Sequence, residues 1–201
     1  LRLGPDGDGF GRVDGGLTLD VLRQNPHGID LGPMAPRIPH NLTTPTGRVQ
    51  LAPDRLVSEI PALARQLDTD PEPCVLIGRR HLRSNNSWMH NVKALVKGKD
   101  RCTLLIHPED AARLGLSAGE SATVSSRIGA IRVPIELSDE MMPGVVSLPH
   151  GWGHDLDGVQ LQVAAARPGV NVNLVSDEKF VDGITGNAAF NGVPVTVEPA
   201  R

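Results

Sequence analysis

The residues with the greatest chemical capacity lie in one stretch, Cys74 to Asn91 (CVLIGRRHLRSNNSWMHN). It begins with an apolar run, Cys74 to Ile77, of the length and composition of a buried strand. Gly78 follows, and its missing Cβ lets a ligand approach the backbone. Guanidinium groups can bind phosphate oxygens through paired N–H bonds, and amides and hydroxyls can bind a heterocycle or a sugar. The groups after Gly78 that could do so are Arg79, Arg80, His81, Arg83, Ser84, Asn85, Asn86 and Ser87. The alternative interpretation is a solvated polar loop at the end of a strand.

A second polar cluster, His150-Gly151-Trp152-Gly153-His154, is followed by two aspartates. Histidine and carboxylate groups are metal-ligand types, so one interpretation is a metal site. The two histidines lie among glycines, however, and the spacing fixes no third ligand. The pattern favours a loop that packs its backbone against a flat ligand, and we assign no metal ligand in this chain.

Two further clusters hold amide and acidic groups. Asn171 and Asn173 alternate, so in an extended segment both amides would point the same way and could bind a purine or pterin edge. They could equally be turn residues after Pro168-Gly169. Asp182, in the sequence DGITGN, could accept from the amino group of a heterocycle or belong to an ordinary loop.

The composition predicts one globular core built from aliphatic side chains. Hydrophobic residues make up 39% of the 201 residues, but aromatic residues only 2%, and Tyr is absent. The net charge of −3 and the scarcity of aromatic rings argue against nucleic-acid binding. The 22 glycines and 17 prolines imply many turns, which favours an all-β barrel or sandwich with a few short helices.

The sequence contains no long apolar window and nothing that resembles a signal peptide, which predicts no membrane insertion and a cytoplasmic location. Because Leu1 is not an initiator methionine, we expect the chain to be a piece of a longer protein. Cys74 and Cys102 occur in apolar strand-like contexts without a C-x-x-C motif. They are predicted to be buried thiols and not parts of a disulfide framework, zinc knuckle or iron–sulfur cluster.

Residues 1–73 are predicted to form an irregular linker from a preceding domain, with few regular elements. We expect a short helix at 17–24, a strand at 48–52 (RVQLA) and a capped helix starting at Ser58. The prolines between residues 26 and 45 predict an extended connector.

Residues 74–201 are predicted to form a β domain. Pro108 and Gly115 frame a helix, and Gly129 centres a hairpin. Segment 156–168 has no clear pattern. Strands are expected at 74–77, 103–107, 121–125, 131–137, 145–148, 173–175 and 193–197. Six or more short strands favour a closed barrel, since closure removes exposed edges.

Several segments between about residues 74 and 198 together resemble one known family. They are Gly78-Arg79 with Ser84-Asn85-Asn86-Ser87, IHPEDAARLGLSAGESATVSSRIGAI, Pro143 to Gly153, and VNLV with Asp182 and Thr185-Gly186 downstream. The most specific is the D-A-x-x-L-G-x-x-x-G-[DE]-x-[AV]-x-V run, from Asp110 to Val124. They are similar to the C-terminal molybdopterin dinucleotide-binding domain of molybdopterin oxidoreductases, the relatives of formate dehydrogenase, nitrate reductase and dimethyl sulfoxide reductase. TPTGRVQL resembles the lead-in of that family, with Gln50 where Glu is usual.

The resemblance implies a six-stranded double-psi β-barrel whose loops on one rim cover molybdopterin guanine dinucleotide. The residues it places against the cofactor are Gly78, Arg79, His81, Asn86, Ser87, His150, Gly151, Asn173 and Asp182. It also implies a parent oxidoreductase that acts on a small-molecule redox substrate with molybdenum or tungsten. The metal ligand and any iron–sulfur cluster would belong to preceding domains, so this chain alone, with no catalytic residue assigned, should be inactive.

Two alternatives use the same kind of barrel for other purposes. A protein-interaction or adaptor module would prefer exposed apolar or aromatic anchors over a row of hydrogen-bond donors. A small decarboxylase that matures by self-cleavage would need a Gly-Ser cleavage site, and the sequence has no Gly-Ser dipeptide. Cofactor binding is therefore the prediction.

Overall fold

A computed structural model of the chain describes residues 1–34, 36–38, 40–70, 72 and 74–200. The chain divides into two compact units, Leu1–Pro53 and Asp54–Arg201. Across the described ranges, no helix is both long enough and apolar enough to cross a membrane.

The first unit is mostly irregular, as predicted for this part of the chain. Its helix α1 (Leu19–Gln24) confirms the helix expected here and begins at Thr18, whose Oγ1 accepts from the N–H of Val21 at 3.1 Å. The strand predicted at 48–52 is wrong, since these residues form bends and irregular chain. An apolar pattern alone does not make a strand when no neighbouring segment pairs with it.

Helices α2 (Asp54–Val57) and α3 (Ile60–Leu67) begin the second unit. The expected helix after Ser58 is confirmed as α3, which has proline in its first turn. The short helix α2 was not predicted.

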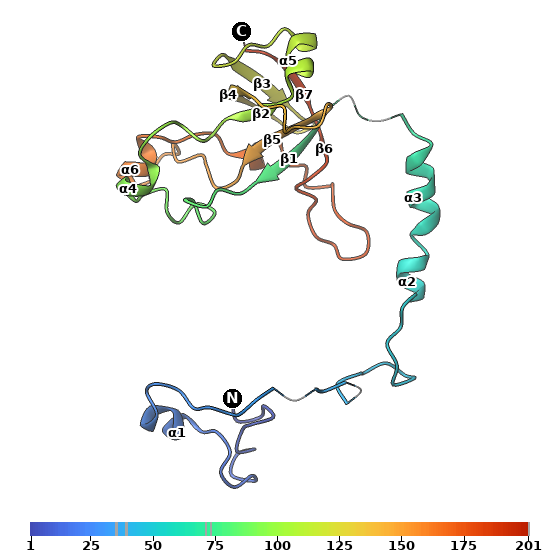
Figure 1. Ribbon diagram of the computed structural model, residues 1–201, viewed down its shortest axis with the longest axis vertical. Coiled ribbons are helices and arrows are strands. Elements are labelled where there is room, and N and C mark those ends of the chain that lie inside the picture. Colours follow the sequence, from blue (N-terminus) through green and yellow to red (C-terminus); the bar gives the residue numbers. More distant parts are fainter. Residues whose placement is uncertain (35, 39, 71, 73, 201) are drawn as a thin grey trace. The chain divides into compact units, whose positions relative to one another are not determined.

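A curled, mixed sheet makes the second unit mainly β, as predicted (Figure 1). Its strands are β1 (Val75–Arg79), β2 (Leu104–Ile106), β3 (Ser121–Ser125), β4 (Ala130–Leu137), β5 (Val145–Pro149), β6 (Val193–Pro194) and β7 (Thr196–Pro199). They follow the order β6-β1-β5-β2-β4-β3-β7. The pairs β1–β5 and β2–β4 are parallel, and the other pairs are antiparallel.

The two ends of this strand order are adjacent in sequence. Only Val195 separates β6 from β7, and its N–H donates to the carbonyl of Cys74 at 3.0 Å. One segment therefore pairs with β1 at its start and with β3 at its end. The sequence predicted a single strand at 193–197. Its division at Val195 gives seven strands where the family resemblance implied six.

Short helices connect the strands: α4 (Lys93–Val96), α5 (Pro108–Leu114), α6 (Gln162–Ala165) and the 3₁₀ helix η1 (Val172–Val175). Helix α5 confirms the prediction from Pro108 and Gly115, and Gly115 ends it in the left-handed conformation, with φ 67°. Helices α4 and α6 were not predicted. The strand predicted at 173–175 is wrong, because the side chain of Asn171 accepts from the N–H of Asn173 and caps a 3₁₀ turn.

An aliphatic core fills the second unit, and α5 aligns the strands that carry the candidate site. The side chains of Leu76, Ile106, Val133, Val146 and Leu148 are among those almost fully buried. Asp110 of α5 is also buried, and its Oδ2 accepts from the N–H of Gly144 at 2.6 Å. The carbonyl of Gly144 in turn accepts from the N–H of Val75 at 2.9 Å. This chain of bonds fixes the starts of β5 and β1 side by side.

Candidate functional site

The carboxyl ends of β1 and β5 meet at one edge of the sheet. Gly78 pairs with Leu148 and Arg79 with Pro149, and the N–H of His150 donates to the carbonyl of Arg79 at 3.3 Å. In Figure 1 both strands point toward the side on which α4 and α6 lie. The polar loop 80–92 and the loop 150–154 consequently leave neighbouring strand ends, which is where sheets with parallel strands bind ligands.

Two glycines let these loops touch. A Cβ on Gly78 would overlap the ring of His150, and a Cβ on Gly151 would lie 2.5 Å from the backbone carbonyl oxygen of Asn86 and 2.9 Å from the nitrogen of Ser87. Gly151 also has a φ of 86°, in the left-handed region. The loops are therefore in backbone contact, and five of the predicted site residues, Gly78, Asn86, Ser87, His150 and Gly151, come together there.

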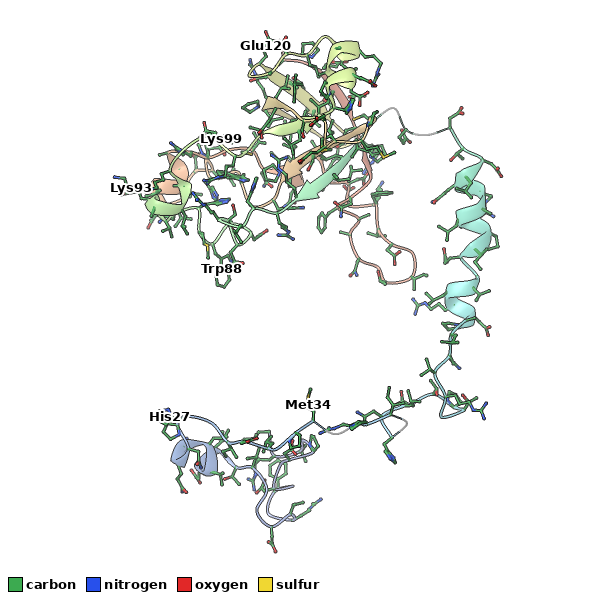
Figure 2. All side chains as sticks on the ribbon, viewed as in Figure 1. His27, Met34, Trp88, Lys93, Lys99 and Glu120 are labelled. Atoms are coloured by element: carbon green, nitrogen blue, oxygen red, sulfur yellow. The ribbon has the colours of Figure 1, made fainter. Side chains whose placement is uncertain are left out.

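The loop 80–92 owes its shape to its asparagines. Asn85 and Asn86 are both left-handed, with φ 42° and 63°, a conformation that asparagine tolerates better than most residues. The side-chain oxygen of Asn86 accepts from Nη1 of Arg80 at 2.6 Å. Figure 2 shows Trp88 pointing outward from this loop, in agreement with its exposed fraction of 83%. The asparagine pair thus has a backbone role as well as amide groups to offer.

Beneath the two loops lies a buried chain of hydrogen bonds that the sequence did not predict. The Nε2 of His90 is 2.9 Å from the Oγ of Ser84, and its Nδ1 is 2.8 Å from the Nε2 of His154. The ring of Trp152 lies against His90, with 4.0 Å between ring centroids and an interplanar angle of 31°. His90 is 1% exposed, Ser84 4% and Trp152 8%. The two histidines of the second polar cluster therefore have different partners, since His150 packs over Gly78.

Arg79 is directed into the domain. Its Nη1 donates to the carbonyl of Ser147 at 2.5 Å, and its Nη2 donates to the carbonyl and hydroxyl of Thr103 at 2.7 and 3.0 Å. Burial lowers the pKa of its guanidinium, with the charge of Glu136 opposing the shift. These bonds tie β1 to β5 and to Thr103, the residue before β2. A contact of Arg79 with a cofactor stays a prediction, and any such contact would have to use its remaining N–H groups.

Two nitrogen atoms near these loops have no partner among the described residues. They are the Nε2 of His81 and the Nε1 of Trp152, both buried. A buried polar atom without a hydrogen bond costs about 1–3 kcal/mol, so such atoms mark places where a ligand or water binds. His81 was predicted as a site residue. Trp152 belongs to the loop whose backbone was expected to pack against a flat ligand, and its ring lies against His90.

The remaining predicted residues belong to other segments. Asn173 is exposed on η1, and Asp182 is exposed in the long loop between η1 and β6, which projects from the sheet in Figure 1. The Oδ1 of Asp182 accepts from both the N–H and the Oγ1 of Thr185 at 2.7 Å, so it shapes its own turn. The end of the same loop does reach the strand ends, because Oδ1 of Asn191 accepts from the N–H of Gly78 at 2.8 Å. Nothing in the local sequence distinguishes Asn191 as a site residue.

The imidazoles of the site all favour their neutral form. Burial lowers the pKa of His81, His90, His150 and His154. The charge of Arg80 lowers the pKa of His150 further. The rim therefore carries arginine charges beside neutral histidines.

The described residues contain no group of three or more His, Cys, Asp or Glu side chains placed to hold a metal ion. Cys74 and Cys102 are free and buried, as predicted, and burial raises the pKa of the Cys74 thiol to about 11. The site can thus offer arginine, amide, hydroxyl and backbone N–H donors to a polar ligand.

Comparison with known proteins gives concordant results. A family model described as molydopterin dinucleotide binding domain matches residues 74–194. The chain is 28% identical over 110 residues to a tetrathionate reductase subunit from Salmonella typhimurium, covering 46% of this chain and 11% of that protein. It is 33% identical over 122 residues to the molybdopterin-containing subunit of an arsenate respiratory reductase from Chrysiogenes arsenatis, covering 58% of this chain and 14% of that protein.

A solved structure shares the fold. Acetylene hydratase from Pelobacter acetylenicus superimposes with a TM-score of 0.55 at 22% identity, over 72% of this chain and 20% of that one. The matched region spans only 11–14% of the two curated relatives.

Proposed function

Through residues 74–194 the chain belongs to the molydopterin dinucleotide binding domain family, and we propose that the loops after β1 and β5 form the rim that binds the cofactor, molybdopterin guanine dinucleotide. One observation carries this proposal. The carboxyl ends of two neighbouring parallel strands bring loop 80–92, with its hydrogen-bond donors, against the glycine-containing loop 150–154.

The donors of this rim suit a dinucleotide. Because the Nη groups of Arg79 bond to backbone carbonyls, phosphate binding falls to the exposed Arg80 and Arg83. Asn86 and Ser87 supply amide and hydroxyl groups beside them. A charge-assisted hydrogen bond contributes about 1.5–3 kcal/mol, so two arginines and two polar side chains could hold a doubly charged ligand.

Features of the structure fit a bound group of this kind. The Nε2 of His81 is buried without a partner among the described residues and lies in the loop that follows β1. Gly78 and Gly151 leave the strand ends and loop backbones open, where a Cβ would fill the space. Asn173 and Asp182 remain proposed contacts; they lie in other segments, on η1 and in the loop between η1 and β6.

We assign the sheet to a six-stranded double-psi β-barrel. If the segment 193–199 is counted as one bent strand, the domain has six strands, and this segment joins the two ends of the strand order. Two parallel pairs, β1–β5 and β2–β4, belong to the same sheet.

We further propose that the chain is part of a molybdenum or tungsten oxidoreductase with a small-molecule redox substrate. The aligned relatives are oxidoreductases and much longer than this chain. When bound, the cofactor supplies two-electron or oxygen-atom transfer, whereas this domain binds and orients it. The preceding domains would supply the metal ligand and any iron–sulfur cluster, so the chain alone should be inactive. A cytoplasmic location remains a prediction.

The test is a titration of the ¹⁵N-labelled chain with molybdopterin guanine dinucleotide released from a known enzyme, with ATP as the control ligand. We expect amide shifts at Gly78, Asn86, Ser87 and Gly151 that ATP does not produce. Identical shifts with both ligands would refute recognition of this cofactor.

A matched pair of variants tests the assignment of charge. Arg80→Ala should weaken binding at least tenfold, because it removes a phosphate donor and frees Asn86. Arg65→Ala removes an exposed arginine on α3 and should leave binding unchanged. Equal affinities of the two variants would contradict a role for Arg80.

A further inference from the structure

Ser84, His90 and His154 form a continuous chain of hydrogen bonds that joins the two loops of the rim. The distances are 2.9 Å from Ser84 Oγ to His90 Nε2 and 2.8 Å from His90 Nδ1 to His154 Nε2. Both ring nitrogens of His90 are therefore engaged, and the ring is 1% exposed. His154 is partly exposed at one end, and Ser84 lies at the other, two residues before Asn86.

A neutral imidazole carries one N–H and one free nitrogen lone pair, so each histidine in this chain donates once and accepts once. In one arrangement His154 donates to His90, and His90 donates to the hydroxyl oxygen of Ser84. In the other, Ser84 donates to His90, and His90 donates to His154. The two arrangements differ only in the positions of the protons, because every heavy-atom distance allows both.

We propose that Ser84, His90 and His154 are a proton relay between the surface at His154 and the cofactor rim at Ser84. A proton that arrives at His154 Nδ1 moves the bridging proton from His154 Nε2 to His90 Nδ1. The proton on His90 Nε2 then passes to Ser84 Oγ, and Ser84 passes its own hydroxyl proton to an acceptor oxygen of the ligand bound at the rim. One proton enters and one leaves, and each imidazole ends neutral in its other tautomer.

The surroundings of the chain suit this role. Trp152 lies against the ring of His90, and this ring is 1% exposed, so water does not exchange protons with the His90 nitrogens directly. Besides burial, His154, His81 and Arg101 lower the pKa of His90 and a backbone hydrogen bond with Gly151 raises it, whereas the charge of Asp155 raises the pKa of His154. Burial is the main reason that both pKa values are lowered, and this keeps both imidazoles neutral and able to pass a proton in either direction.

A proton relay suits the cofactor because two-electron reactions commonly move protons with the electrons. This link rests on the proposed function. The relay itself can be tested in the free chain. Failure of the relay and failure of cofactor binding are therefore separate results, and the cofactor titration described above measures the second one.

The experiment is NMR of the chain with ¹⁵N-labelled histidine, measuring how fast the ring N–H of His90 exchanges with water. We expect a downfield bridging proton between His90 and His154, both tautomers of His90, and exchange at least tenfold faster than in His154→Gln. Glutamine can make the same bond at the position of Nε2, but it does not pass a proton as imidazole does.

Two controls separate transfer from positioning. In His154→Gln the amide shifts of Asn86 and Gly151 should stay in place, which shows that the loops keep their contact. His27→Gln replaces an exposed histidine of the first unit and should leave the exchange of His90 unchanged. Equal exchange in the wild type and His154→Gln, or absence of the bridging proton in the folded chain, would overturn the relay.

Discussion

Gly151→Ala tests whether the two rim loops depend on direct backbone contact. Gly151 has a φ of 86°, and a Cβ there would lie 2.5 Å from the carbonyl oxygen of Asn86. Gly158 provides a matched control, because its φ is also 86° but a Cβ there would meet no atom within 4 Å. The two positions therefore share the same φ, and a Cβ meets the neighbouring loop only at Gly151.

The magnitudes follow from these two contributions. Placing an L-residue in the left-handed region costs about 1–2 kcal/mol, which applies to both variants. Gly151→Ala must also displace a backbone segment, and overpacking of this kind costs about 1–3 kcal/mol more. We thus expect a loss of stability of about 1–2 kcal/mol for Gly158→Ala and about 2–5 kcal/mol for Gly151→Ala.

Urea denaturation of both variants measures the difference, and amide shifts at Asn86 and Ser87 report whether loop 80–92 has moved. Those shifts should appear in Gly151→Ala and not in Gly158→Ala. Equal losses of stability, without shifts at Asn86, would refute the loop contact as the determinant of the rim.

Three other perturbations follow from the described contacts. Arg79→Lys should cost about 2–3 kcal/mol in urea denaturation, because one ammonium group cannot replace both Nη groups, whereas Arg65→Lys should be neutral. Burial alone would raise the pKa of Asp110, but hydrogen bonds from Arg113 and Gly144 lower it below its usual value. Asp110→Asn should therefore lower the urea midpoint at pH 7. The difference between wild type and variant should disappear as acid protonates the carboxyl of the wild type. His90 and His154 have lowered pKa values in the folded chain, so just below pH ~6.5 only the unfolded chain binds their protons. The free energy of unfolding should therefore fall on acidification, by at most about 1.4 kcal/mol per pH unit for each histidine. A flat stability profile between about pH 7.5 and 5.5 would argue against neutral histidines.

Elements with local signals could be predicted from the sequence. Pro108 and Gly115 specify the start and the end of α5, and Gly129 lies in the turn between β3 and β4. The apolar run before Gly78 is β1, as expected. The strand at 48–52 was wrong because strands need partners, which a local pattern does not reveal.

The site was only partly predictable, for the same reason. Gly78, Asn86 and Gly151 come together because β1 and β5 pair in parallel, and the polar residues that follow strands are visible in the sequence. His90 was missed, since its role depends on a bond to His154, 64 positions away. The donors of Arg79 are evident from its residue type, but the carbonyls of Ser147 and Thr103 that accept from it are not.

The single segment that forms β6 and β7 also has a consequence for how the domain assembles. Its partners are distant in sequence, since Pro194 pairs with Val75 and Thr196 pairs with Ser125. Such non-local pairing makes folding slow, because long loops must close before the contacts form. Until the segment docks, β1 and β3 both present unpaired backbone edges, which recruit other chains. Substitutions that weaken docking, such as Val195→Asp, should therefore be recognised first by aggregation during refolding.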